Sequence, residues 1–205
     1  KIDPVTGFVN LLYADDLKYK NQEQAKSFIE KIDNIYFENG EFKFDIDFSK
    51  WNSRYSISKT KWTLTSYGTR IHTFRNPHKN NQWDSVEYDL TEEFKLILNT
   101  DGTLKSQDVE TYKKFMSLFK LMLQLRNSVT GTDIDYMISP VADKTGANFD
   151  SRKNIKNLPV DADANGAYNI ARKGVMAIEN IMNGISDPLK ISNEDYLKYI
   201  QSQQE

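Results

Sequence analysis

Residues 161–170 read Asp-Ala-Asp-Ala-Asn-Gly-Ala-Tyr-Asn-Ile, two carboxylates followed by mostly small side chains. From Ala167 onward, apolar residues recur at helical spacing, which predicts a helix that starts after Asp163 and ends before Gly184. A carboxylate at a helix N-terminus is stabilised by the helix dipole and often serves only as a cap. The cap is the more common role, and a metal ligand is the alternative. The small residues at 164–167 would let the helix pack close to a sheet, which fits both nucleotidyl-transfer folds and ordinary tight packing. The segment alone leaves both interpretations open.

The sequence allows only a narrow range of metal chemistry. The chain has no cysteine and two histidines, His72 and His78, which excludes zinc ribbons and three-histidine zinc sites. Any metal must therefore bind carboxylates, the ligands that magnesium and manganese prefer. A two-metal site needs several carboxylates from separate segments. Asp163 alone cannot hold two ions, and Asp161 points roughly the opposite way if the segment is extended.

The composition predicts a folded chain of 205 residues, since 39% of the residues are hydrophobic and 12% are aromatic. The apolar runs are too short to cross a bilayer, so we expect no membrane among its partners. The formal net charge is −2, whereas a free-standing nucleic-acid binder usually carries a basic excess. Any contact with DNA must therefore use local patches or a larger basic partner.

Local signals predict the remaining secondary structure. Asn39-Gly40 predicts a tight type I′ turn between strands at residues 35–38 and 41–44. Gly68 predicts a second hairpin, formed by residues 62–67 and 70–74. Periodicity and capping residues predict helices at 22–33, 110–127 and 192–201, a strand at 135–141, loops at 49–60, 75–84 and 142–160, and an undecided helix or strand at 91–98.

Two charged residues lie between the predicted helix at 110–127 and the predicted strand at 135–141. Arg126 stands near the helix C-terminus, where a cation interacts favourably with the last carbonyls. Its guanidinium can also grip a phosphate in a bidentate way. Asp135 precedes the strand, where a turn or an ion pair is the plain alternative to a functional role.

Basic and aromatic residues alternate through much of the region from residue 50 to residue 79. Lys50, Arg54, Lys61, Arg70 and Arg75 are the candidate nucleic-acid-binding cations. Cations of this kind steer a single strand while neighbouring rings stack on its bases. An ordinary solvated loop is the alternative for each of them.

Residues 161–171 resemble the third RuvC motif of the type V-A CRISPR effectors, a family of RNA-guided DNA endonucleases. Residues 1–8 resemble the segment that follows the family's second RuvC motif, and residues 123–128 the end of the helix that carries its Nuc-domain arginine. Residues 138–141 and 149–152 match as well. Several motifs in the same order are a strong signal, whereas any one would be weak.

The resemblance implies an α+β chain in which a Nuc domain is inserted between segments of a RuvC domain with an RNase H-like fold. Residues 47–158 are expected to form the Nuc domain. Residues 1–46 and 159–205 are expected to belong to the RuvC domain, the latter with its third acidic motif.

The resemblance also implies roles for individual residues. Asp163 matches a magnesium ligand of the RuvC site, where manganese can substitute, and Arg126 matches the arginine tied to efficient cutting of the target strand. Asp135 matches an acidic residue beside that arginine. The implied partners are a CRISPR guide RNA, target DNA and the remainder of the effector, in the cytoplasm of a prokaryote that uses the system for antiviral defence.

The chain departs from the family pattern because the acidic residues of the first and second RuvC motifs are absent. We therefore expect it to be incomplete and inactive as a catalyst by itself. One alternative is a non-catalytic module that binds and loads single-stranded DNA. Another is an unrelated metal-dependent hydrolase that uses Asp150, Asp161 and Asp163, provided that these carboxylates lie within metal distance of one another.

Overall fold

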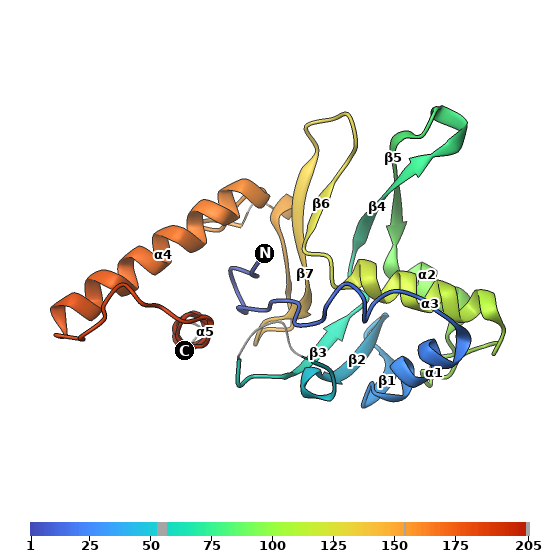
Figure 1. The fold of residues 1–205 in the computed structure, drawn as a ribbon, viewed down its shortest axis with the longest axis horizontal. Helices are drawn as coiled ribbons and strands as arrows, with labels where there is room; N and C mark the ends of the chain where they lie inside the picture. The colour runs from blue at the N-terminus through green and yellow to red at the C-terminus, as the bar shows by residue number, and fades with distance from the viewer. Residues whose placement is uncertain (53–56, 154, 204–205) are drawn as a thin grey trace.

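The computed structural model describes residues 1–52, 57–153 and 155–203, which form a mixed α and β fold (Figure 1). The described helices are α1 Gln22–Glu30, α2 Leu90–Ile97, α3 Val109–Met122, α4 Ala162–Met182 and α5 Asn193–Ser202. The described strands are β1 Asn34–Glu38, β2 Glu41–Asp47, β3 Lys61–Thr65, β4 Thr69–Asn76, β5 Gln82–Asp89, β6 Arg126–Ser128, β7 Asp135–Ala142 and β8 Asn148–Asp150. None of the helices described is long and apolar enough to cross a membrane.

The first predicted hairpin is confirmed. Strands β1 and β2 pair antiparallel, with Glu38 opposite Glu41 at the turn. Asn39 and Gly40 have φ angles of 53° and 84°, the left-handed conformation that a type I′ turn requires at both positions. Along β2, buried and half-buried residues alternate, as expected for a strand with one face in the core.

The second predicted hairpin is wrong. Strand β3 pairs with β2, which makes the sheet order β1-β2-β3, and β4 pairs with β5 instead. Gly68 does turn the chain, at a φ of 74°, but the turn leads out of one sheet and into another. The predicted loop at 75–84 is consequently the tip of the β4–β5 hairpin, which projects from the body of the molecule (Figure 1).

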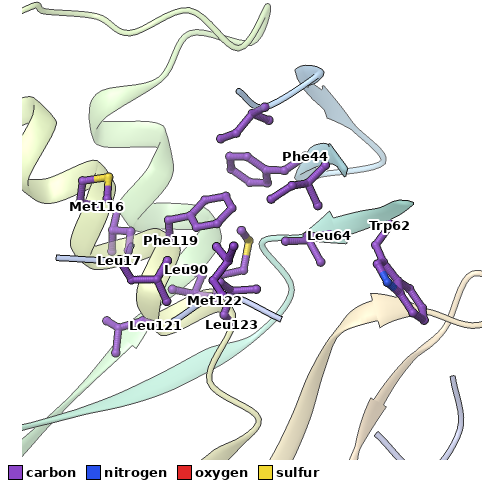
Figure 2. Close-up of a cluster of buried hydrophobic side chains, with 14 of the residues drawn as sticks. Leu17, Phe44, Trp62, Leu64, Leu90, Met116, Phe119, Leu121, Met122 and Leu123 are labelled. Carbon is purple, nitrogen blue, oxygen red and sulfur yellow. The ribbon is translucent and has the colours of Figure 1, made fainter. Parts of the chain in front are cut away.

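Aromatic rings form the centre of the hydrophobic core. The ring of Phe44 on β2 lies 4.9 Å from that of Phe94 on α2 and 5.8 Å from that of Phe119 on α3. All three side chains are fully buried, and Figure 2 shows Phe119 and Leu64 converging near Phe44. Burying one such ring stabilises the fold by about 1.5–3 kcal/mol. The sequence left residues 91–98 undecided between helix and strand. Residues 90–97 form helix α2, which packs on β2 through the Phe94 ring.

The helix predicted at 110–127 is shorter than expected. It ends at Met122, and residues 126–128 form strand β6. Leu125 fits the helical apolar spacing and is buried, but it lies after the end of the helix. The apolar pattern therefore extends further along the sequence than the helix does. The predicted strand at 135–141 is confirmed as β7, whereas the predicted loop at 142–160 contains the short strand β8.

The two ends of the chain lie against each other. Asn165 Nδ2 donates to the Ile2 carbonyl at 3.1 Å, and Arg172 Nη1 donates to the Pro4 carbonyl at 2.7 Å. Ile200 on α5 and Met176 on α4 share a small core cluster with Ile2. The predicted boundary after residue 46 falls inside β2, before its last residue, and β2 is hydrogen-bonded to β1 and β3 on its two sides.

Helix α4 ends before Gly184 as predicted, but it starts at Ala162, so Asp163 lies in its first turn and not before it. The helix is also not packed as its sequence suggested. It extends away from the sheets (Figure 1), and a Cβ built on Gly166 would meet nothing within 4 Å. Ala162 is fully buried in the main core, whereas Gly166 and Ala167 do not pack closely on a sheet. Much of its predicted apolar stripe is exposed, including Ile170, Ile178 and Ile181.

A matched pair of glycine substitutions tests how closely the loop after α2 approaches β1. Gly102 and Gly40 both have a φ of 84°, but a Cβ on Gly102 would lie 1.9 Å from the Ile35 carbonyl oxygen, while one on Gly40 meets nothing within 4 Å. We expect Gly102→Ala to lower the free energy of unfolding by at least about 3 kcal/mol, and Gly40→Ala by only about 1–2 kcal/mol of backbone strain. Denaturant titration measures both losses, and equal losses would contradict the close approach.

Candidate functional site

Two carboxylates that the sequence singled out, Asp135 and Asp163, lie beside the guanidinium of Arg126, the third residue singled out. Arg126 Nη2 lies 2.6 Å from Asp135 Oδ2, and Arg126 Nη1 lies 3.7 Å from Asp163 Oδ1. The Nε of Arg126 donates to Ser128 Oγ at 3.2 Å. The arrangement therefore brings together residues that are up to 37 positions apart in the sequence (163 minus 126).

The strand register explains this convergence. Strands β6 and β7 pair antiparallel, with Ser128 opposite Asp135 and Arg126 opposite Met137. Ser128 Oγ lies 3.4 Å from Asp135 Oδ1, so the hydroxyl joins the carboxylate to the guanidinium. Helix α4 contacts β7, which places the first turn of the helix beside this pair.

The two carboxylates at the start of α4 have different local roles. Asp161 is the N-cap and accepts hydrogen bonds from the backbone N–H groups of Asp163 and Ala164 at 2.9 and 2.7 Å. The capping role considered for this segment thus falls to Asp161. The Asp163 side chain is 83% exposed, so it is accessible to a ligand.

The environment of Arg126 differs from the plain alternative considered for it. The residue lies on a strand, not near a helix C-terminus, so interaction with the last helical carbonyls is ruled out. Asp135 holds Nη2 of the guanidinium, and Ser128 holds Nε. The Nη1 edge faces Asp163 beyond hydrogen-bond distance, and the Arg126 side chain is 42% exposed. That edge can donate hydrogen bonds to a phosphate oxygen, because the planar guanidinium directs its N–H groups at oxyanions.

The residues described do not by themselves make a magnesium site. Within residues 1–52, 57–153 and 155–203, no group of three or more acidic or histidine side chains could hold a metal ion. Asp150 is nearly buried and accepts two hydrogen bonds from the guanidinium of Arg152, at 2.9 and 2.8 Å. The hydrolase that would use Asp150, Asp161 and Asp163 together is therefore not supported. Asp163 can supply one oxygen ligand, and further ligands would have to come from elsewhere.

The predicted nucleic-acid-binding cations occupy separate places. Lys50 is paired with Asp33, Lys61 begins the edge strand β3, and Arg75 lies on the β4–β5 hairpin. Arg54 lies outside the described residues. The four cations that are described do not form one continuous basic patch with Arg126, so each has to be judged by its own surroundings.

Arg70 requires a correction, because its side chain is fully buried. Nη1 donates to the carbonyls of Tyr67 and Thr69 at 3.0 and 3.1 Å, while Nε and Nη2 lack a partner among the described residues. Burial lowers the pKa of Arg70 to about 9, which still leaves it charged at neutral pH. A strand bound at the surface cannot reach it, so the prediction that Arg70 binds nucleic acid is wrong for this conformation.

Sequence reasoning missed Trp83 as a partner of Arg75. The two residues are opposite each other in the β4–β5 pairing, and the guanidinium carbon of Arg75 lies 4.2 Å from the centre of the Trp83 ring. Trp83 is 54% exposed, which is suited to stacking with an unpaired base. The signal became readable only once β4 was known to pair with β5, because the predicted hairpin placed both residues in a loop.

Comparison with protein families gives one match. The family model NUC, described as a nuclease domain, matches residues 2–153. The matched region includes Arg126 and Asp135 and ends before Asp163. It also includes residues on both sides of the predicted boundary after residue 46.

A double-mutant cycle tests whether the Arg126 cluster has a structural role. We expect the Arg126–Asp135 pair to contribute a coupling of about 0.2–1 kcal/mol to the free energy of unfolding, because the ion pair is partly exposed. The Arg126–Asp163 pair should contribute less, since it is longer and more exposed. Denaturation of the single and double alanine variants measures both couplings. A coupling above about 2 kcal/mol would mean that the cluster mainly stabilises the fold.

Proposed function

The chain belongs to the nuclease-domain family NUC, and on that premise we propose that it acts in DNA hydrolysis as one part of an RNA-guided endonuclease of a CRISPR defence system. In this proposal the chain helps bring the target strand to a RuvC site and contributes one acidic residue to that site. The start of the chain and residues 159–205 would belong to the RuvC part, and residues 47–158 would belong to the inserted Nuc part.

The observation that carries the proposal is the placing of Arg126 between Asp135 and Asp163. Asp135 and Ser128 orient the guanidinium, which lowers the cost of ordering it when a phosphate binds. The exposed Nη1 edge faces the carboxylate that the family resemblance identifies as a metal ligand. A phosphate held there would lie beside Asp163, where a scissile phosphodiester has to lie if Asp163 acts in cutting.

Asp163 would supply one oxygen ligand to magnesium, and a partner segment would supply the others. When bound, magnesium activates water as the nucleophile and stabilises the leaving oxygen. The exposed side of α4 supports the idea of a partner segment. Ala167, Ile170 and Ile181 are exposed on the same side of α4 as Asp163, so an apolar surface leads directly away from the carboxylate. A segment packed on this surface could carry further acidic residues to the site.

The second candidate is a module that binds and loads single-stranded DNA without cutting it. The absence of a group of three metal-binding side chains in the described part of the chain favours this reading for the chain alone. The exposed Arg75–Trp83 pair favours it further, because a cation stacked on a ring suits both the backbone and the bases of a single strand.

Substitutions in the effector that contains this chain test the site assignment. Asp163→Asn should reduce cutting of both DNA strands by at least about 100-fold, because it removes a metal-ligand charge. Arg126→Ala should mainly slow the strand that this domain delivers. Asp133→Asn is the matched control, since it removes an exposed carboxylate from the neighbouring β6–β7 loop. Product formation on each labelled strand is the measurement, and unchanged cutting by Asp163→Asn would refute the assignment.

An assay on the chain alone tests the proposal that a partner segment completes the catalytic site. With fluorescent single-stranded DNA and magnesium or manganese, we expect salt-sensitive binding without cutting. Arg126→Ala should reduce the slope of log K against log salt by about 0.7, the value for one phosphate contact to a single strand. Metal-dependent cutting that disappears in Asp163→Asn would mean that the chain carries a complete catalytic site, which contradicts the partner-segment proposal.

A further inference from the structure

A cavity of about 460 Å³ opens between the start of β3 and the end of β7. Three lysines line it, Lys59, Lys61 and Lys144, together with a single carboxylate, that of Asp143. The cavity lies at the opposite end of β7 from Asp135. Along a strand of this length, the two ends are roughly 20 Å apart. The cavity is therefore separate from the Arg126 cluster.

The positive charge in this cavity is offset only in part, by Asp47, which lies opposite Lys61 in the β2–β3 pairing. In the described part of the chain, none of the three lysines forms a salt bridge. The Asp143 carboxylate is already used by its own turn, where it accepts from the backbone N–H and hydroxyl of Thr145 at 2.8 and 2.6 Å. Lys59 Nζ lies 3.9 Å from the centre of the Trp62 ring, and burial lowers the pKa of this lysine. The lining thus has a surplus of cations.

Two buried donors at the same cavity also lack acceptors. Trp62 and Gln201 both line it, and Trp62 Nε1 and Gln201 Nε2 have no hydrogen-bond partner among the described residues. Trp62 is only 8% exposed, and its indole extends from β3 at the margin of the core (Figure 2). A buried donor without a partner costs about 1–3 kcal/mol. A ligand with several acceptor oxygens would remove that cost.

We propose that this cavity binds a phosphate group of single-stranded DNA. A phosphate offers negative charge to the lysines and several oxygens to the donors, whereas a neutral ligand would leave the lysines unbalanced and a metal cation would be repelled. The phosphate chemistry follows from the cavity lining alone. That a DNA strand carries the phosphate rests on the proposed function. A strand engaged both here and at Arg126 would span the roughly 20 Å between the two ends of β7.

The test uses the indole N–H signal of Trp62 in the ¹⁵N-labelled chain, assigned with a Trp62→Phe variant. Inorganic phosphate and an oligothymidylate are titrated separately at constant ionic strength, with chloride as the reference anion. We expect both phosphate ligands to shift the Trp62 signal in a saturable way. Lys61→Met combined with Lys144→Met should weaken both affinities at least ten-fold and reduce the salt slope for the strand by about 1.4.

Lys26→Met combined with Lys95→Met is the control, because it removes the same charge from exposed sites elsewhere and should change the affinities less than two-fold. An equal shift with chloride would overturn the inference. So would strand binding that leaves the Trp62 signal unmoved, although the proposed function would then still stand. A shift with inorganic phosphate but no binding of the strand would keep the phosphate site and reject the proposed DNA partner.

Discussion

Burial of strand β7 is the constraint on which the rest of the structure depends. Its residues from Tyr136 to Val141 are all buried, and the strand pairs with both β6 and β8 while also contacting β3. Polar groups in this layer are satisfied locally. Asn148 donates to the Ser139 carbonyl and to Thr65, and Asn127 accepts from the backbone N–H of Ile71. Because such bonds are costly to break when buried, β7 has one register, and each end of it presents a fixed set of side chains.

The two ends of β7 use charge in different ways. At Asp135 a single arginine, Arg126, lies between two carboxylates, so the local charge is negative. Binding of a phosphate there would depend on the orientation of the guanidinium more than on the local electrostatic potential. At the end near Lys144, three lysines and one carboxylate line the cavity. Their ammonium groups attract an anion without the fixed planar geometry of a guanidinium. This division is consistent with a net charge of −2 for the whole chain, since binding to phosphate depends on local placement of charge as well as on the total.

The sequence predicted elements whose signals are local. The Asn39-Gly40 turn, the helix predicted at 192–201 and the end of α4 before Gly184 depend on residues a few positions apart, and all three are found. Strand partners depend on distant residues, so the pairing of β3 with β2 could not be read from the Gly68 turn. The same limit explains the misplacing of Arg70, because burial of an arginine follows from the packing of two sheets and not from its neighbours in sequence.

Helix α4 is supported along one side only. Asn165, Arg172 and Met176 attach it to the N-terminal segment and to α5, while Ile170, Ile178 and Ile181 on the other side are exposed. The two sides are therefore subject to different selection. A replacement on the attached side changes the stability of this domain, whereas a replacement on the exposed side leaves the domain folded and alters what assembles on it. Natural variation along this one helix should consequently divide into two sets with a period of 3.6 residues, and only the set on the attached side should co-vary with the N-terminal segment and α5.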